Sequence, residues 1–146
     1  MRFIVLVKAS KDSEAGILPS EELLVEMGKF NQKLLNAGVM LAGEGLFPSS
    51  KGARVTFNQN RRIVTDGPFT ETKELIAGYW IWKLNSLQEA IEWVKECPNP
   101  TGAMGEIGIR QIMEIEDVCG SQSPKILEEQ QRLCDQASHL VGTATP

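Results

Sequence analysis

Two segments of this chain carry apolar side chains on both faces of an extended strand, and this pattern constrains the fold more than any other feature. In Arg2–Lys8 the apolar residues occupy both alternating faces, and the longer segment Leu75–Leu84 repeats the pattern. In the longer segment one face has Ala77, Tyr79 and Ile81, and the other has Ile76, Trp80, Trp82 and Leu84. Such strands are typical of sheets covered on both sides. The fold must therefore supply a cover for each face.

Two helices are predicted from capping residues and helical spacing. The first begins after Ser20, with acidic residues in its first turn, and ends at Gly38. The second begins at Ser86, which is expected to form a capping box with Glu89, and Pro98 and Pro100 end it. The side chains expected to be buried are Leu23, Met27, Phe30 and Leu34 in the first helix and Leu87, Ala90, Ile91 and Val94 in the second.

Four further segments read as strands. Val39–Phe47 ends before Pro48, and Glu106–Ile115 alternates with Ile107, Ile109, Met113 and Ile115 on one side. Ala53–Phe57 and Arg61–Thr65 predict a β-hairpin over a loop at residues 58–60. The order strand, helix, strand, inserted hairpin, strand, helix, strand predicts an α+β, ferredoxin-like split βαβ fold with an antiparallel sheet and both helices on one face.

The uncovered face of this sheet predicts a homodimer. Two helices cover one face, whereas the strands are apolar on both, and an exposed apolar sheet of that size invites association. We expect two copies to pack through their sheet faces.

Composition limits the possible functions. The 146 residues fit one domain, with 15 basic and 19 acidic residues, a net charge of −4 and a sequence pI of about 5.1. Nucleic-acid binders usually carry a basic patch, so we expect no nucleic-acid partner and interpret Arg54, Arg61 and Arg62 as a solvated hairpin face. The amino-terminal apolar run is too short for a signal peptide or a membrane span.

Cysteine and histidine usage argues against several chemistries. Cys97, Cys119 and Cys134 are odd in number and lack CxxC spacing, which predicts neither disulfides nor a zinc site and indicates the cytoplasm. The sole histidine, His139, lies near the end of the chain, so a histidine–carboxylate pair within the domain is not expected. No P-loop, dinucleotide-binding or GxSxG motif occurs, and we expect neither metal nor organic cofactor.

Carboxylates and arginines remain as candidate site residues. Asp66 precedes Gly67 and Pro68, so a turn is expected to hold it, either as an acid or base or as a cap for the amides that follow. Glu44 lies between two strand glycines and needs a partner, for which Arg54 or Arg110 is suitable; an arginine there binds a substrate carboxylate or forms an interface ion pair. Thr65, Thr70 and Lys73 are expected to line the loop of Asp66 and bind substrate.

The same loop carries a family resemblance. Asp66-Gly67-Pro68-Phe69 followed by residues 70–74, with Ala42–Leu46 and Lys51–Val55 before it, resembles the YCII-related proteins of the DGPF subgroup, from Met1 to about Asp117. The resemblance implies a bacterial family of ferredoxin-like domains that dimerise into an α+β barrel, with activity largely unassigned and some members beside sigma-factor-like regulators. Many DGPF relatives have His or Gln where this chain has Phe47, a departure that argues against a histidine mechanism.

Residues 118–146 form a carboxy-terminal extension beyond the 1–117 domain. Its composition shifts to Ser, Gln and Glu, Pro124 is suitable as a first helical residue, and the apolar residues Ile126, Leu127, Leu133 and Leu140 are loosely periodic. Both a docked helix and a frayed extension fit this pattern.

Two functions follow from these observations. The first is a small cytoplasmic homodimer that uses Asp66, and Glu44 with it, for acid–base chemistry of the isomerase or lactone type on a small molecule. The alternative is a non-catalytic ligand-binding or regulatory module associated with transcriptional control. A third possibility is a purely structural dimer in which DGPF is a turn.

Overall fold

The computed structural model describes residues 1–102, 104–114, 117 and 124–142. The chain divides into two compact units, Met1–Gln111 and Ile112–Pro146. No helix of the described residues is long and apolar enough to cross a membrane.

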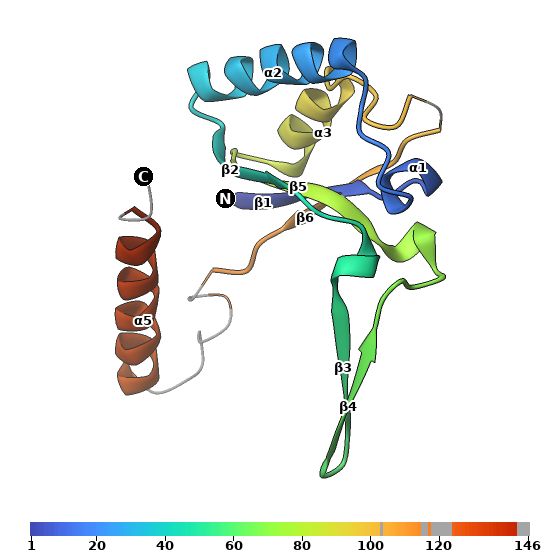
Figure 1. Cartoon of the computed structure of the whole chain (residues 1–146). Helices are drawn as coiled ribbons and strands as arrows, with labels where there is room; N and C mark the ends of the chain where they lie inside the picture. Colours follow the sequence, from blue (N-terminus) through green and yellow to red (C-terminus); the bar gives the residue numbers. More distant parts are fainter. Residues whose placement is uncertain (103, 115–116, 118–123, 143–146) are drawn as a thin grey trace. The chain divides into compact units, whose positions relative to one another are not determined.

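A four-stranded antiparallel sheet forms the centre of the first unit. It contains β1 (Arg2–Lys8), β2 (Met40–Gly45), β5 (Ile76–Lys83) and β6 (Ile107–Gln111), in the order β2-β5-β1-β6. Helices α2 (Glu21–Asn36) and α3 (Leu87–Lys95) lie together on one face (Figure 1). This order, with two helices on one face, is the ferredoxin-like arrangement, so the predicted fold class is confirmed.

The helix-covered face carries the core. Phe3, Val5, Trp80 and Trp82 of the central strands are buried against Phe30, Leu34 and Ala90 of the helices. The rings of Phe30, Trp80 and Trp82 meet with centroids 5.9–6.3 Å apart, and the Trp80 Nε1–H donates to Asn31 Oδ1 at 3.0 Å. Trp80 and Trp82 are therefore core residues rather than walls of a ligand cavity.

The opposite face of the sheet, called the open face below, carries a second set of apolar side chains. Ile4 pairs with Ile81 and Leu6 with Tyr79, and all four are half-buried. Neither α2 nor α3 covers this face (Figure 1). The helices of the unit therefore cover one of the two apolar faces of β1 and β5.

The second helix, α3, differs from the prediction in its capping hydrogen bonds and in the side chains that it buries. Ser86 accepts a hydrogen bond from the Glu89 amide, as predicted, but the Glu89 carboxylate accepts from the Asn85 amide at 2.9 Å rather than from Ser86. Leu87 is half-exposed, whereas Trp93 packs on the core with Val94. The first helix follows its predicted stripe, and Gly38 stops it with a φ of 68°.

The predicted hairpin is present as a separate two-stranded sheet. It consists of β3 (Ala53–Asn58) and β4 (Arg61–Asp66), inserted between β2 and β5. Two short helical turns flank the hairpin in sequence, η1 (Ser49–Lys51) before it and η2 (Thr72–Glu74) after it, and a third, α1 (Lys11–Glu14), follows β1. The sequence pattern predicts none of the three.

The last strand is shorter than predicted, because β6 ends at Gln111 and Met113 is 66% exposed beyond it. Ile115, assigned to the same strand, lies outside the described residues. The second unit contains α5 (Pro124–Gly142), which begins at Pro124 as the sequence suggests and includes His139.

Candidate functional site

The DGPF segment begins where β4 ends. Asp66 is the last residue of the strand, its side chain is exposed, and a cis peptide bond joins Gly67 to Pro68. The Gly67 amide donates to the Gly52 carbonyl at 3.0 Å, and the Phe69 amide donates to Ser49 Oγ at 3.0 Å. No described residue donates a hydrogen bond to the Asp66 carboxylate, so the expected cap of the following amides is wrong.

Ser49 and Glu14 anchor this turn instead. The Glu14 carboxylate accepts from the Ser49 amide at 3.2 Å and from the Ser49 hydroxyl. The same hydroxyl oxygen accepts from Phe69. Sequence reasoning missed this link, because Glu14 and Ser49 are 35 residues apart and no local pattern relates them.

Gly67 is required for space rather than for its backbone angles. Gly67 is not one of the glycines with a positive φ, so its backbone angles do not require a glycine. A Cβ at this position would lie 1.8 Å from the Ser49 carbonyl oxygen and 2.6 Å from its carbon. The turn therefore packs directly on the backbone of η1.

Arg54 closes the other side of the loop. Its guanidinium carbon lies 3.9 Å from the centre of the Phe69 ring, and its Nη1 lies 3.5 Å from Glu71 Oε2. The Glu71 carboxylate also accepts from the Thr70 hydroxyl at 3.0 Å. The hydrogen bond from its own backbone amide, then that from Thr70, and the charge of Arg54 lower the pKa of Glu71 below the ordinary 4.5.

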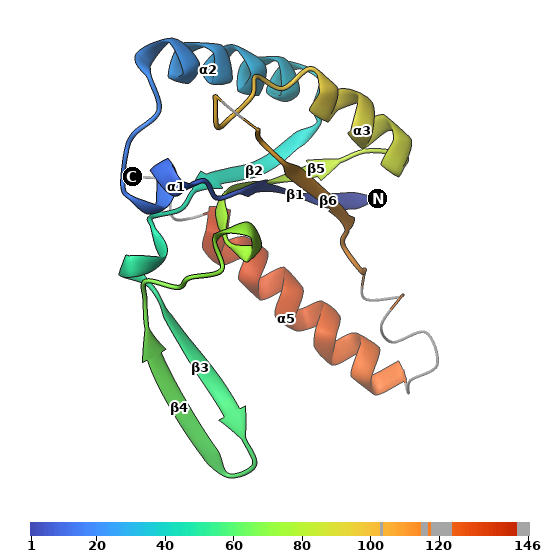
Figure 2. The ribbon, with the colours of Figure 1, turned by 90° about the vertical axis from the view of Figure 1, so that its right-hand side faces the viewer.

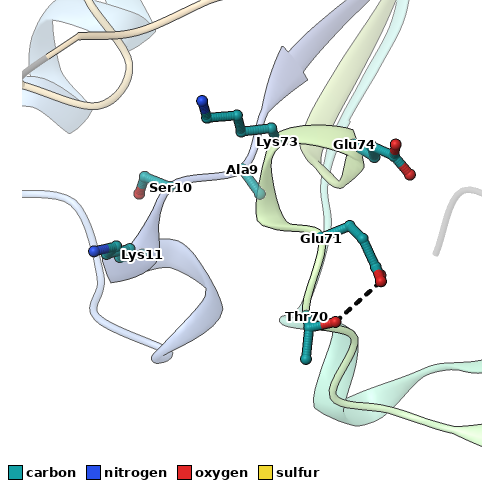
Figure 3. A pocket seen from close by; sticks show the side chains of 7 residues that line it. All are labelled: Ala9, Ser10, Lys11, Thr70, Glu71, Lys73 and Glu74. Atoms are coloured by element: carbon teal, nitrogen blue, oxygen red, sulfur yellow. Dashed lines mark hydrogen bonds between the residues drawn. The ribbon is translucent and has the colours of Figure 1, made fainter.

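A hollow of about 560 Å³ lies beside this loop, within the size range of small-molecule sites. It is lined by Ala9, Ser10, Lys11, Thr70, Glu71, Lys73 and Glu74 (Figure 3). In this view the amino groups of Lys11 and Lys73 point away from the carboxylates of Glu71 and Glu74. Two predicted substrate-binding residues, Thr70 and Lys73, therefore line one cavity.

The other predicted site residues lie elsewhere. Thr65 pairs with Arg54 across the hairpin, so both are on one face of it, and Asp66, the next residue, is on the opposite face. Glu44 belongs to β2, where it pairs with Tyr79 on the open face and is exposed. Asp66 and Glu44 thus belong to different sheets.

Among the residues that the structure describes, neither Arg54 nor Arg110 pairs with Glu44 as expected. Arg54 pairs with Glu71, and Arg110 is on β6, at the opposite edge of the sheet from β2. Gly43, beside Glu44, makes room for the core, since a Cβ there would lie 2.5 Å from Trp80 Cδ1. Packing against Trp80 therefore explains the glycine at position 43, whereas a Cβ at Gly45 would meet nothing within 4 Å.

Among the described residues, no group of three or more His, Cys, Asp or Glu side chains is placed to hold a metal ion. Cys97 is half-buried, and its burial raises the pKa of the thiol to about 11.

The ferredoxin-like sheet with an inserted hairpin and a turn packed on η1 defines a small α+β domain. The model of the YCII-related domain matches residues 1–116, and the chain belongs to this family.

Two further similarities were found. An uncharacterized protein of Rhizobium meliloti (strain 1021) is 27% identical over 92 residues, which are 63% of this chain and 74% of that protein. The structure of 5-chloro-2-hydroxyhydroquinone dehydrochlorinase from Burkholderia phenoliruptrix AC1100, in complex with 2,5-dihydroxybenzoquinone, is 13% identical with a TM-score of 0.44; the match covers 78% of this chain and 95% of that one.

Proposed function

We propose that this protein is a homodimer that binds a small organic anion in the hollow beside the DGPF loop. The observation that carries the proposal is the charge balance of the hollow. Lys11 and Lys73 form no ion pair with any described residue, whereas Glu71 is already matched by Arg54 and Thr70. The hollow therefore has two ammonium groups without an ion pair, those of Lys11 and Lys73, and one such carboxylate, that of Glu74. This excess of positive charge favours a ligand that carries a carboxylate or phosphate group.

Binding would be tested by thermal shift with inorganic phosphate and a panel of small carboxylates, lactones and amides. A ligand at about 100 times its Kd stabilises the folded protein by roughly 2.7 kcal/mol. Lys73→Met should weaken the binding of an anion at least about tenfold, because a charge-assisted hydrogen bond contributes roughly 1.5–3 kcal/mol. Lys95→Met serves as the control, since Lys95 is on α3, outside the hollow, and pairs with Glu92. Equal loss in both variants, or in neither, would refute this site.

The homodimer is supported by the open face of the sheet. Ile4, Leu6, Tyr79 and Ile81 form a continuous apolar patch there, and helices α2 and α3 are on the other face. Sedimentation should therefore give about twice 16.1 kDa. Ile4→Glu should dissociate the dimer with the fold retained, whereas Val5→Glu, at a fully buried core position, should unfold the chain. A folded wild-type monomer at micromolar concentration would contradict the dimer.

Acid–base catalysis by Asp66 is the second candidate. One observation favours it: the carboxylate accepts no hydrogen bond from the described residues, so the turn does not use it. Asp66→Asn keeps the shape and removes the ionisable group. Turnover of an identified substrate should then fall by about 10²–10⁴-fold with melting unchanged. If the protein is a non-catalytic sensor, Asp66→Asn should lower only its affinity for the ligand. If turnover and affinity are both unchanged in Asp66→Asn, Asp66 is neither catalytic nor ligand-binding.

A further inference from the structure

The β3–β4 hairpin, residues 53–66, is called the arm below; Arg54 at its base contacts Phe69 and Glu71 of its own unit. Every residue of its two strands is exposed, and the strands pair with each other alone among the described strands. A lone two-stranded hairpin is marginally stable in water and needs packing against another surface. Beyond its base, the arm therefore lacks the contact that a stable hairpin requires.

The two faces of the arm differ in chemistry. One face carries Arg54, which packs on Phe69 and pairs with Glu71 of its own chain. The other face carries Val55 and Val64, which are directly paired, and Phe57, whose ring lies 4.4 Å from the guanidinium carbon of Arg62 on the same face. Val55, Val64 and Phe57 are called the apolar face. Their exposed fractions are 49%, 63% and 70%. The Arg54 face carries one large apolar side chain, Ile63, which is 47% exposed, so the apolar face offers a partner the larger apolar surface.

The arm points to the side of the sheet where a second copy would sit. Helices α2 and α3 are on one side of the sheet, and the arm extends from the other side in both views (Figures 1 and 2). The arm therefore extends on the side of the open face rather than on the side of the helices.

Charge favours the same partner. Residues 53–66 contain three arginines and one aspartate, a net charge of +2, and the rest of the first unit, residues 1–52 and 67–111, contains ten basic and twelve acidic residues, a net charge of −2. A basic arm is thus electrostatically complementary to the body of another copy.

We propose that the arm of each protomer packs its apolar face on the body of the other in the homodimer. This inference rests on the homodimer proposed above and adds a second contact to it. Asp66 is on the same side of the arm as Val55 and Val64, so its free carboxylate would lie at this contact, where the partner contributes to its surroundings.

The test is a charge placed on each face of the arm. Val64→Glu combined with Phe57→Ser buries a carboxylate and removes the aromatic ring at two symmetry-related contacts, and the dimer Kd should rise at least about 10²-fold. Thr56→Glu places a carboxylate on the opposite face and should change the Kd by less than about threefold. Sedimentation measures the Kd, and circular dichroism checks that each variant is folded.

The outcomes separate the two proposals. A wild-type monomer refutes the dimer and the arm together; a wild-type dimer that the double variant leaves intact refutes the arm alone. Hydrogen exchange of the unmodified chain provides a check that needs no variant. Amides 53–66 should exchange more slowly at dimer concentrations than after dilution to monomer, and equal exchange would refute the contact. Saturable binding of a short DNA duplex at physiological salt, lost in Arg61→Ser, would instead assign the arm to nucleic acid.

Discussion

Replacing Gly67 with alanine is the most direct test of how the DGPF turn is built. The new methyl carbon would lie 1.8 Å from the Ser49 carbonyl oxygen, 2.6 Å from its carbon and 3.1 Å from the Ser50 amide nitrogen. All three atoms belong to the backbone, so no side chain can rotate away. Either the turn or η1 has to move.

The magnitude follows from what holds these two segments. Overpacking a fitted site costs typically about 1–3 kcal/mol. Displacing Ser49 also strains its bonds to Glu14 and Phe69, and a lost hydrogen bond contributes about 0.5–1.5 kcal/mol. We expect Gly67→Ala to lower the free energy of unfolding by about 2–4 kcal/mol, or the Tm by roughly 6–15 °C for a chain of this size.

Urea unfolding followed by tryptophan fluorescence gives the free energy. Gly28→Ala is a matched control, because Gly28 is inside α2 and a Cβ there has nothing within 4 Å. That change should stabilise the protein by about 0.5–1 kcal/mol, the helix preference of alanine over glycine. If Gly67→Ala unfolds within about 0.5 kcal/mol of the wild type, the packing explanation of this glycine is wrong.

Two further predictions concern ionisation. Glu71 should titrate below its ordinary pKa in a carbon-13 NMR titration. Its stabilising effect should be present above the unfolded pKa and lost as pH falls through the folded one. Thr70→Val and Arg54→Met should each raise the Glu71 pKa, and a variant that leaves this pKa unchanged would contradict the cause assigned to it. Cys97, with a pKa of about 11, should be alkylated at pH 8 roughly 10²-fold more slowly than a thiol of pKa 9, and comparable labelling of Cys97 and the exposed Cys134 would contradict its burial.

The candidate site was only partly predictable from the sequence. Thr70 and Lys73 do line a cavity, but Lys11 and Ser10 complete it from a segment about sixty residues earlier, which no local pattern relates to the loop. Two roles were considered for Asp66, acid or base and cap of the following amides. The structure argues against the cap, because the amides of Gly67 and Phe69 donate to Gly52 and Ser49. Hydrogen-bond partners that come from distant segments depend on the assembled fold, so residue types alone do not assign them.

The sequence by itself determined the fold class. Near-continuous apolar runs place β1 and β5, and the 3.6-residue period places α2 and α3, because burial of apolar side chains dominates the free energy of a small domain. The two-faced strands also predict that the sheet needs a second cover, whatever supplies it.

Only the tertiary structure decided what each special residue does. Gly67 is a glycine because the backbone of Ser49 lies against it, and Gly43 because Trp80 does. The split of the hairpin into a face held by Arg54 on its own loop and an apolar face left open also follows from contacts between distant segments. Such contacts are set by packing in three dimensions, where residues far apart in the chain share one space, and a one-dimensional pattern carries no record of them.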